Sequence, residues 1–258
     1  MDERHQRALR MQRALDKRFF RKGLVIAIIS GICYGLFTAF LNLGLDTGIW
    51  AEWAGGAVSA FAVVYLVSAM GNALMYTFGA TWSLLLSAKQ GKLGDFFRSL
   101  WTKPGRQIIL AALLGGPVAG TSYVIALQQA GAIVIPIAAL DAAVGAVLGW
   151  ALYKQKLTPR IITGLFICFV ASMMIAGPSL LGDAPEGMAG GIVMAFVAAI
   201  GWGLEGCLAG YATSMVDYQI GITIRQFTGG LTNLIIVVPA LSLIGGDGIS
   251  YGWHLLVL

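Results

Sequence analysis

The sequence contains few charged residues. Asp, Glu, Lys and Arg make up 11% of its 258 residues, whereas about 25% is typical of a soluble domain. Hydrophobic residues make up 58%, and the mean hydropathy is +0.80. A soluble core could not bury this much apolar surface. The composition therefore excludes an ordinary water-soluble domain and indicates a membrane protein.

Histidine is scarce as well, with only His5 and His254, each near one end of the sequence. Neither a catalytic triad nor a histidine-containing metal cluster can be assembled from them. The sequence also has no G-x-x-x-x-G-K-[ST] loop to bind ATP. We therefore expect no enzymatic activity, no metal site and no cofactor.

The apolar residues form long runs of about 20 residues, the length that crosses a bilayer as a helix. We predict an all-α polytopic fold with seven spans and an eighth that begins near the last residue. Their approximate positions are 23–45, 56–87, 107–129, 131–152, 160–178, 188–213, 219–244 and 252–258.

The basic residues lie on one side of this predicted topology. Eight precede the first span, five lie at 89–106, three lie at 154–160, and Arg225 follows the start of the seventh span. By the positive-inside rule the N-terminus is cytoplasmic. The net charge of +5 then reflects topology and contact with anionic lipid. Membrane lipid is an expected partner, and nucleic acid is not.

Two segments of the sequence are similar to one another. GLVIAIISGICYGLFTAF (23–40) and GIVMAFVAAIGWGLEGCL (191–208) share six identical positions of eighteen, and Tyr34 corresponds to Trp202. Five spans separate the two copies, so the second enters the membrane in the opposite direction. Inverted repeats of this kind are common in secondary transporters. We predict a cytoplasmic segment at 1–22, a five-helix repeat at 23–180 and an incomplete repeat at 187–258, with about three helices expected after Leu258.

Residues 111–178 carry a family pattern: a span rich in small residues, a Tyr-x-x-Ala-Leu stretch, a Gly turn, and a span followed by Lys-x-Lys-Leu-Thr. This pattern resembles the EamA-type transporters of the drug/metabolite transporter superfamily. The second repeat, with Trp-Gly-x-Glu and Ile-Arg-Gln (201–226), is most similar to the branch that contains bacterial choline transporters. The resemblance implies a protein of the bacterial plasma membrane. The chain departs from the pattern at Gln155, where Glu is usual, and at Asp141-Ala142, where an aromatic residue and Pro are usual.

Glu205 lies about halfway along a predicted span, where a charged carboxylate is unfavourable by roughly 2.5–3.5 kcal/mol on insertion scales. Acids in such positions usually line a solute or ion pathway. Trp202 precedes it by three residues and shares its helix face. A carboxylate beside the aromatic rings of Trp202 and Tyr34 would suit an organic cation, although both rings could equally serve helix packing.

Three further polar residues in predicted spans are candidates. Asp141, five residues after Pro136, could be a second cation ligand, a proton-coupling acid or a buried neutral acid. Asn72 and Tyr123 could line the same cavity or hydrogen-bond between helices. We expect Arg225 to extend toward the cytoplasmic face, with Asp217 as one potential partner.

These features together predict a secondary transporter that moves a small organic solute, such as a choline-like cation, by alternating access. A proton-coupled exporter of amino acids or other metabolites is the alternative in the same class. A membrane scaffold in which the acids are simply buried is the alternative from another class. The expected partners are the solute and membrane lipid, and a homodimer is left open.

Overall fold

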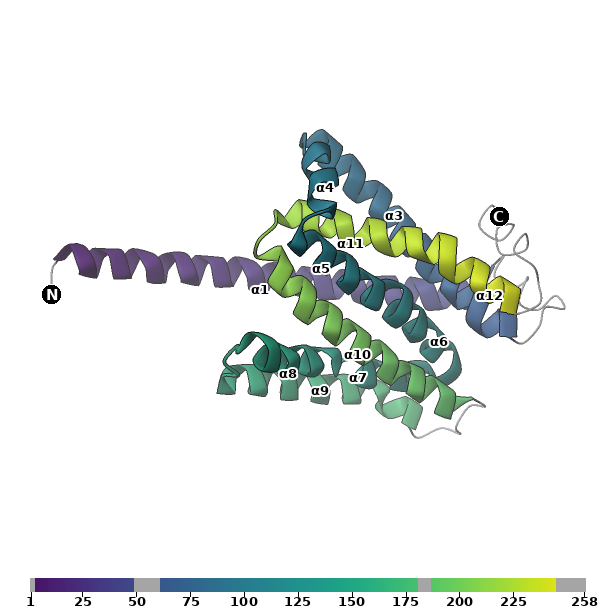
Figure 1. Ribbon diagram of the computed structural model, residues 1–258. Coiled ribbons are helices and arrows are strands. Elements are labelled where there is room, and N and C mark those ends of the chain that lie inside the picture. The colour runs from purple at the N-terminus through teal and green to yellow at the C-terminus, as the bar shows by residue number, and fades with distance from the viewer. Residues whose placement is uncertain (1–2, 49–60, 181–186, 245–258) are drawn as a thin grey trace. The chain divides into compact units, whose positions relative to one another are not determined.

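The computed structural model describes residues 3–48, 61–180 and 187–244 (Figure 1). Within these ranges every regular element is a helix and there is no strand, as the sequence predicts. The predicted eighth span at 252–258 lies outside the described residues, as does the start of the second at 56–60. The chain divides into two compact units, Met1–Glu52 and Trp53–Leu258.

The first unit consists of one long helix, α1 (Glu3–Asp46). No proline interrupts this stretch, so the basic segment and the first predicted span continue into one another without a break. The part from Phe20 to Leu41 is apolar and long enough to cross a membrane. Its large apolar side chains, such as Ile28, Ile32 and Phe40, are exposed, as lipid contact requires.

The second unit contains the remaining helices. In chain order they are η1 (Ala62–Leu66), α3 (Val67–Lys89), α4 (Leu93–Leu100), α5 (Lys103–Leu113), η2 (Leu114–Gly120), α6 (Thr121–Ala130), η3 (Gly131–Ile133), α7 (Val134–Ala138), α8 (Asp141–Tyr153), α9 (Pro159–Leu180), α10 (Met188–Thr213), α11 (Tyr218–Thr232), η4 (Asn233–Val237) and α12 (Val238–Ile244). The segments η1, η2 and η4 are π-helical, and η3 is a short 3₁₀ turn.

Four helical stretches of the described residues are long and apolar enough to cross a membrane: Phe20–Leu41, Lys103–Ala138, Met188–Thr213 and Tyr218–Ile244. They coincide with four of the seven predicted spans and suggest a multi-pass membrane protein. The helices Asp141–Tyr153 and Pro159–Met174 are apolar but shorter.

The predicted span over 131–152 contains two apolar helices, α7 and α8, with a break between them. Gly131 ends α6 with a positive φ of 62°, a conformation that glycine adopts at little cost. After α7 the chain turns at 139–140, and α8 begins at Asp141. Gly131 lies at the predicted boundary between the third and fourth spans. Apolar composition alone does not reveal the break at 139–140, because Ala139 and Leu140 are themselves apolar.

Helix α10 is central to the second unit and packs against α5, η2, α6, α7 and α8, while α11 packs along α3 and α5 (Figure 1). Small residues permit the close approach of these helices. Ala119, Ala126, Ala195 and Ala198 are fully buried in the cluster between α10 and the η2–α7 region. The candidate acid Glu205 therefore lies on a helix that packs against several other segments of this unit.

Candidate functional site

Glu205 is buried on α10, with 5% of the residue exposed. Its carboxylate lies against the backbone of Gly115 in η2, where an added Cβ atom would come within 1.8 Å of Oε2. Only glycine leaves room for the carboxylate at this position. The group that approaches the Gly115 backbone is thus the acid itself.

Arg225 of α11 neutralises this carboxylate. Its Nε donates to Oε1 of Glu205, and its Nη2 donates to Oε2 at 3.1 Å, which makes the pair bidentate. The prediction that Arg225 extends away from the site is wrong. Because a lone carboxylate is strongly disfavoured between apolar helices, a guanidinium that can reach it is drawn inward.

An aromatic ring completes this arrangement. The Arg225 guanidinium carbon lies 5.8 Å from the ring centroid of Tyr76 on α3, within the range of a cation–π contact. Tyr76 is itself buried, and its ring packs against the backbone of Gly116 and Gly229. The site therefore contains a carboxylate, a cation and an aromatic face, contributed by α10, α11 and α3.

Trp202 reaches the same turn of η2 as Glu205. Its indole N–H donates to the carbonyl of Gly115 at 3.0 Å, and its ring lies 5.0 Å from that of Tyr123. The structure thus brings together Glu205, Trp202 and Tyr123, three of the predicted site residues. In this arrangement the aromatic face beside the cation belongs to Tyr76.

Asn72 lies on the other side of η2. Its amide nitrogen lies 3.0 Å from the Gly116 carbonyl, 3.2 Å from Oγ1 of Thr121 and 3.3 Å from Oδ1 of Asn233. All three side chains are buried. An amide group has only two hydrogens to share among three acceptors. The hydroxyl of Thr121 relieves this shortage by donating to Asn233 at 3.5 Å.

Asp141 is the first residue of α8, and its carboxylate accepts a hydrogen bond from the backbone N–H of Ala142. Gly203 of α10 packs against this turn: an added Cβ would lie 3.0 Å from the Asp141 carbonyl. Asp141 therefore belongs to the helix contact next to Glu205. Among the described residues it forms no ion pair.

Tyr34 belongs to α1 in the first unit, where its ring lies 5.9 Å from that of Phe37. Trp202 belongs to the second unit, so the predicted place of Tyr34 opposite it stays a prediction. The inverted repeat stays a prediction for the same reason.

Arg225 and Tyr76 are the site residues that sequence reasoning missed. Tyr76 follows Asn72 by four residues, a spacing that places both on one helix face. Arg225 lies in the apolar stretch Ile-Thr-Ile-Arg-Gln-Phe. The charge of Arg225, opposite in sign to that of Glu205 and also within a predicted span, was the signal that could have identified the pair. Buried charges are usually paired.

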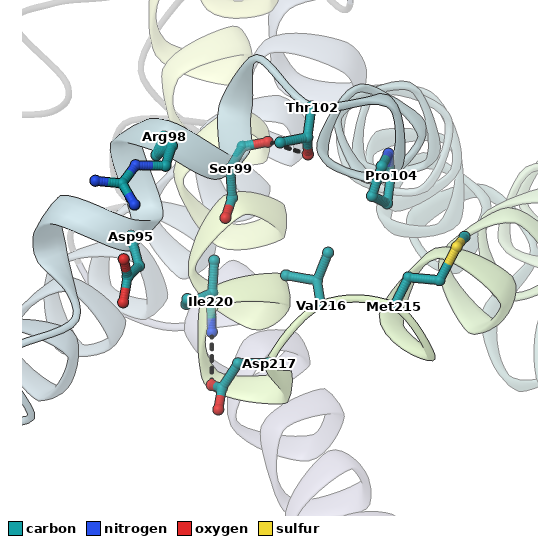
Figure 2. Close-up of a pocket in the computed structure, with 9 residues that line it drawn as sticks. All are labelled: Asp95, Arg98, Ser99, Thr102, Pro104, Met215, Val216, Asp217 and Ile220. Carbon is teal, nitrogen blue, oxygen red and sulfur yellow. Dashed lines mark hydrogen bonds between the residues drawn. The ribbon is translucent and has the colours of Figure 1, made fainter.

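Asp217, the predicted partner of Arg225, pairs with Lys92 instead, at 2.8 Å. It also caps α11 by accepting from the N–H groups of Gln219 and Ile220. The Lys92 hydrogen bond, together with these backbone bonds, lowers the pKa of Asp217 from its ordinary value. Figure 2 shows Asp217 beside a pocket of about 310 Å³, formed by the α4–α5 turn and the α10–α11 turn.

Within the described part of the chain, no three His, Cys, Asp or Glu side chains lie close enough to hold a metal ion. No family model, curated protein or solved structure matches the chain.

Proposed function

We propose that this chain belongs to a secondary transporter that moves a small organic cation across the bacterial plasma membrane by alternating access. The single observation that carries the proposal is the bidentate pair between Glu205 and Arg225, next to the Tyr76 ring. A carboxylate beside an aromatic face is the chemistry that binds organic cations. The resemblance of 201–226 to the choline-transporter branch supports the same solute class.

In the proposed mechanism the guanidinium of Arg225 occupies the place that the solute takes. The Arg225 side chain is 36% exposed, whereas that of Glu205 is 7% exposed. Arginine can therefore withdraw outward while the acid stays in place. An arriving cation replaces the guanidinium on the carboxylate, so that Glu205 never stays buried and unpaired. Asp141, Trp202, Tyr123 and Asn72 are proposed to line or support the pathway.

A proton can replace the guanidinium in the same way, which is the mechanism of the alternative, a proton-coupled exporter of amino acids or other metabolites. Protonation of Glu205 would release Arg225 from the pair. The scaffold alternative requires neither exchange. In that case the pair only joins α10 to α11.

Calorimetric titration of the chain in nanodiscs with tetramethylammonium tests the proposal. We expect Glu205→Gln to weaken binding more than about tenfold, which corresponds to about 1.4 kcal/mol, because the amide keeps the shape and removes the charge. The matched control is the double variant Glu205→Gln/Gln226→Glu, which places a new acid one residue from Arg225. Its affinity for tetramethylammonium should stay as low as that of Glu205→Gln alone. A wild-type chain that binds no quaternary ammonium would rule out the cation proposal.

A further inference from the structure

The corner between α3 and α5 combines exposed aromatic and basic side chains. Helix α4 is fixed here by Phe96, which is fully buried against Ile108, Ile220 and Ile224 and lies edge-on to Phe227 at 5.7 Å. Its orientation is therefore determined by the bundle. The neighbouring Phe97 is 57% exposed and Trp101 is 82% exposed. Two large aromatic rings thus project from a rigid support without burial in the described protein.

The same corner is strongly basic. The described exposed residues from 89 to 106 include one acid, Asp95, and four basic residues: Lys89, Arg98, Lys103 and Arg106. The fifth basic residue, Lys92, is already paired with Asp217. None of the four forms an ion pair with the described residues. The corner therefore presents a net positive charge that the protein itself does not neutralise.

The corner also lies where membrane-crossing helices end. The candidate spans that start at Lys103 and at Tyr218 both begin here, and the span that starts at Met188 ends nearby at Thr213. Gly221 packs against Thr213, which keeps these helix ends together. The pocket in Figure 2 lies between them, with Arg98 and Asp95 on one wall and Asp217 on the other. This level of the bundle corresponds to the boundary between hydrocarbon and water.

We infer that the α4 corner, defined by Phe97, Arg98, Trp101, Lys103 and Arg106, binds the headgroups of anionic phospholipid. Tryptophan and phenylalanine enter the interface, where amphipathic rings are favoured. The guanidinium and ammonium groups contact phosphate, and the negative potential of an anionic leaflet attracts them. The inference concerns a lipid surface and does not depend on the identity of the solute.

Brominated lipids test this assignment, because bromine quenches tryptophan fluorescence only at close range. The chain is placed in bilayers that contain brominated phosphatidylglycerol or, at the same fraction, brominated phosphatidylcholine. The contribution of Trp101 is obtained by subtracting the signal of Trp101→Phe. We expect stronger quenching by phosphatidylglycerol, and we expect the difference to shrink as salt is raised.

The variant Arg98→Gln/Lys103→Gln/Arg106→Gln should lower this lipid preference at least about fivefold. The matched control is Lys154→Gln/Lys156→Gln/Arg160→Gln, which removes three exposed basic residues and should keep the preference. Equal quenching by the two lipids in the unmodified chain would overturn the inference. Absence of quenching by either lipid, or an equal loss in the control variant, would overturn it too.

Discussion

Glu205 and Arg225 form a two-point ion pair that joins α10 to α11 over the face of Tyr76. The acid is buried and the base is partly exposed. Breaking a buried pair by removing one partner is unfavourable by about 3–5 kcal/mol. The pair therefore links the two helices. In this pair, only another cation or a proton can take the place of the Arg225 guanidinium on the Glu205 carboxylate.

Gly115→Ala should disrupt this pair. The added methyl group would lie 1.8 Å from Oε2 of Glu205, so the carboxylate must move, and we expect a loss of about 1–3 kcal/mol in the free energy of unfolding. Gly206→Ala is the matched control, because it adjoins Glu205 and has open space around it. It should be neutral or stabilising by up to about 1 kcal/mol. Unfolding in mild detergent measures both, and equal effects would refute this packing argument.

Asn72→Leu should lower the free energy of unfolding by about 1–2 kcal/mol. The substitution removes the amide donor that lies within hydrogen-bond distance of the Gly116 carbonyl, Thr121 and Asn233. We expect no water to replace this donor, because the Asn72, Thr121 and Asn233 side chains are buried between helices. Thr81→Ala on the same helix is the control, because its hydroxyl bonds only to the preceding turn and is exposed. A silent Asn72→Leu would mean that the buried network contributes no stability.

The cap of α11 formed by Asp217 should give a pH dependence. Lys92 lowers the pKa of Asp217, so this carboxyl stabilises the fold fully above its unfolded pKa of about 3.9. The contribution is lost as pH falls through the lower, folded pKa. Asp217→Asn keeps a capping side chain but cannot titrate, so its unfolding midpoint should start lower at pH 7 and fall less in acid.

Asp95→Asn serves as the control for that measurement, since Asp95 forms no ion pair with the described residues. It should retain the wild-type pH profile. If Asp217→Asn lost as much stability in acid as the wild type does, titration of Asp217 would not be the cause of that loss.

The predicted topology can be tested with reporter fusions. A reporter inserted at 46–54 or 178–187 should be exported, and one inserted at 90–105 should stay cytoplasmic, because the basic residues cluster on that side. The opposite pattern would reverse the orientation, and it would place the α4 corner on the outer leaflet.

Run length and hydropathy were sufficient to predict the helical class and four of the long apolar helices. They did not reveal the break at 139–140 within the predicted span over 131–152, because Ala139 and Leu140 carry no polar signal. Glu205, Trp202 and Tyr123 could be predicted and are brought together, because polar and aromatic residues stand out in an apolar helix. The partner of Glu205 could not be predicted, because it depends on how α11 packs against α10, and twenty residues separate Arg225 from the acid.

Tetramethylammonium binding to Arg225→Gln tests the central claim most directly. If Arg225 occupies the place of the solute cation, its removal frees the carboxylate, and affinity at neutral pH should rise at least about tenfold over wild type. The ligand should also restore the thermal stability that the variant loses, because it pairs the Glu205 carboxylate that the substitution leaves without its partner. An affinity equal to or weaker than wild type, with no recovery of stability, would contradict the exchange of cations at Glu205.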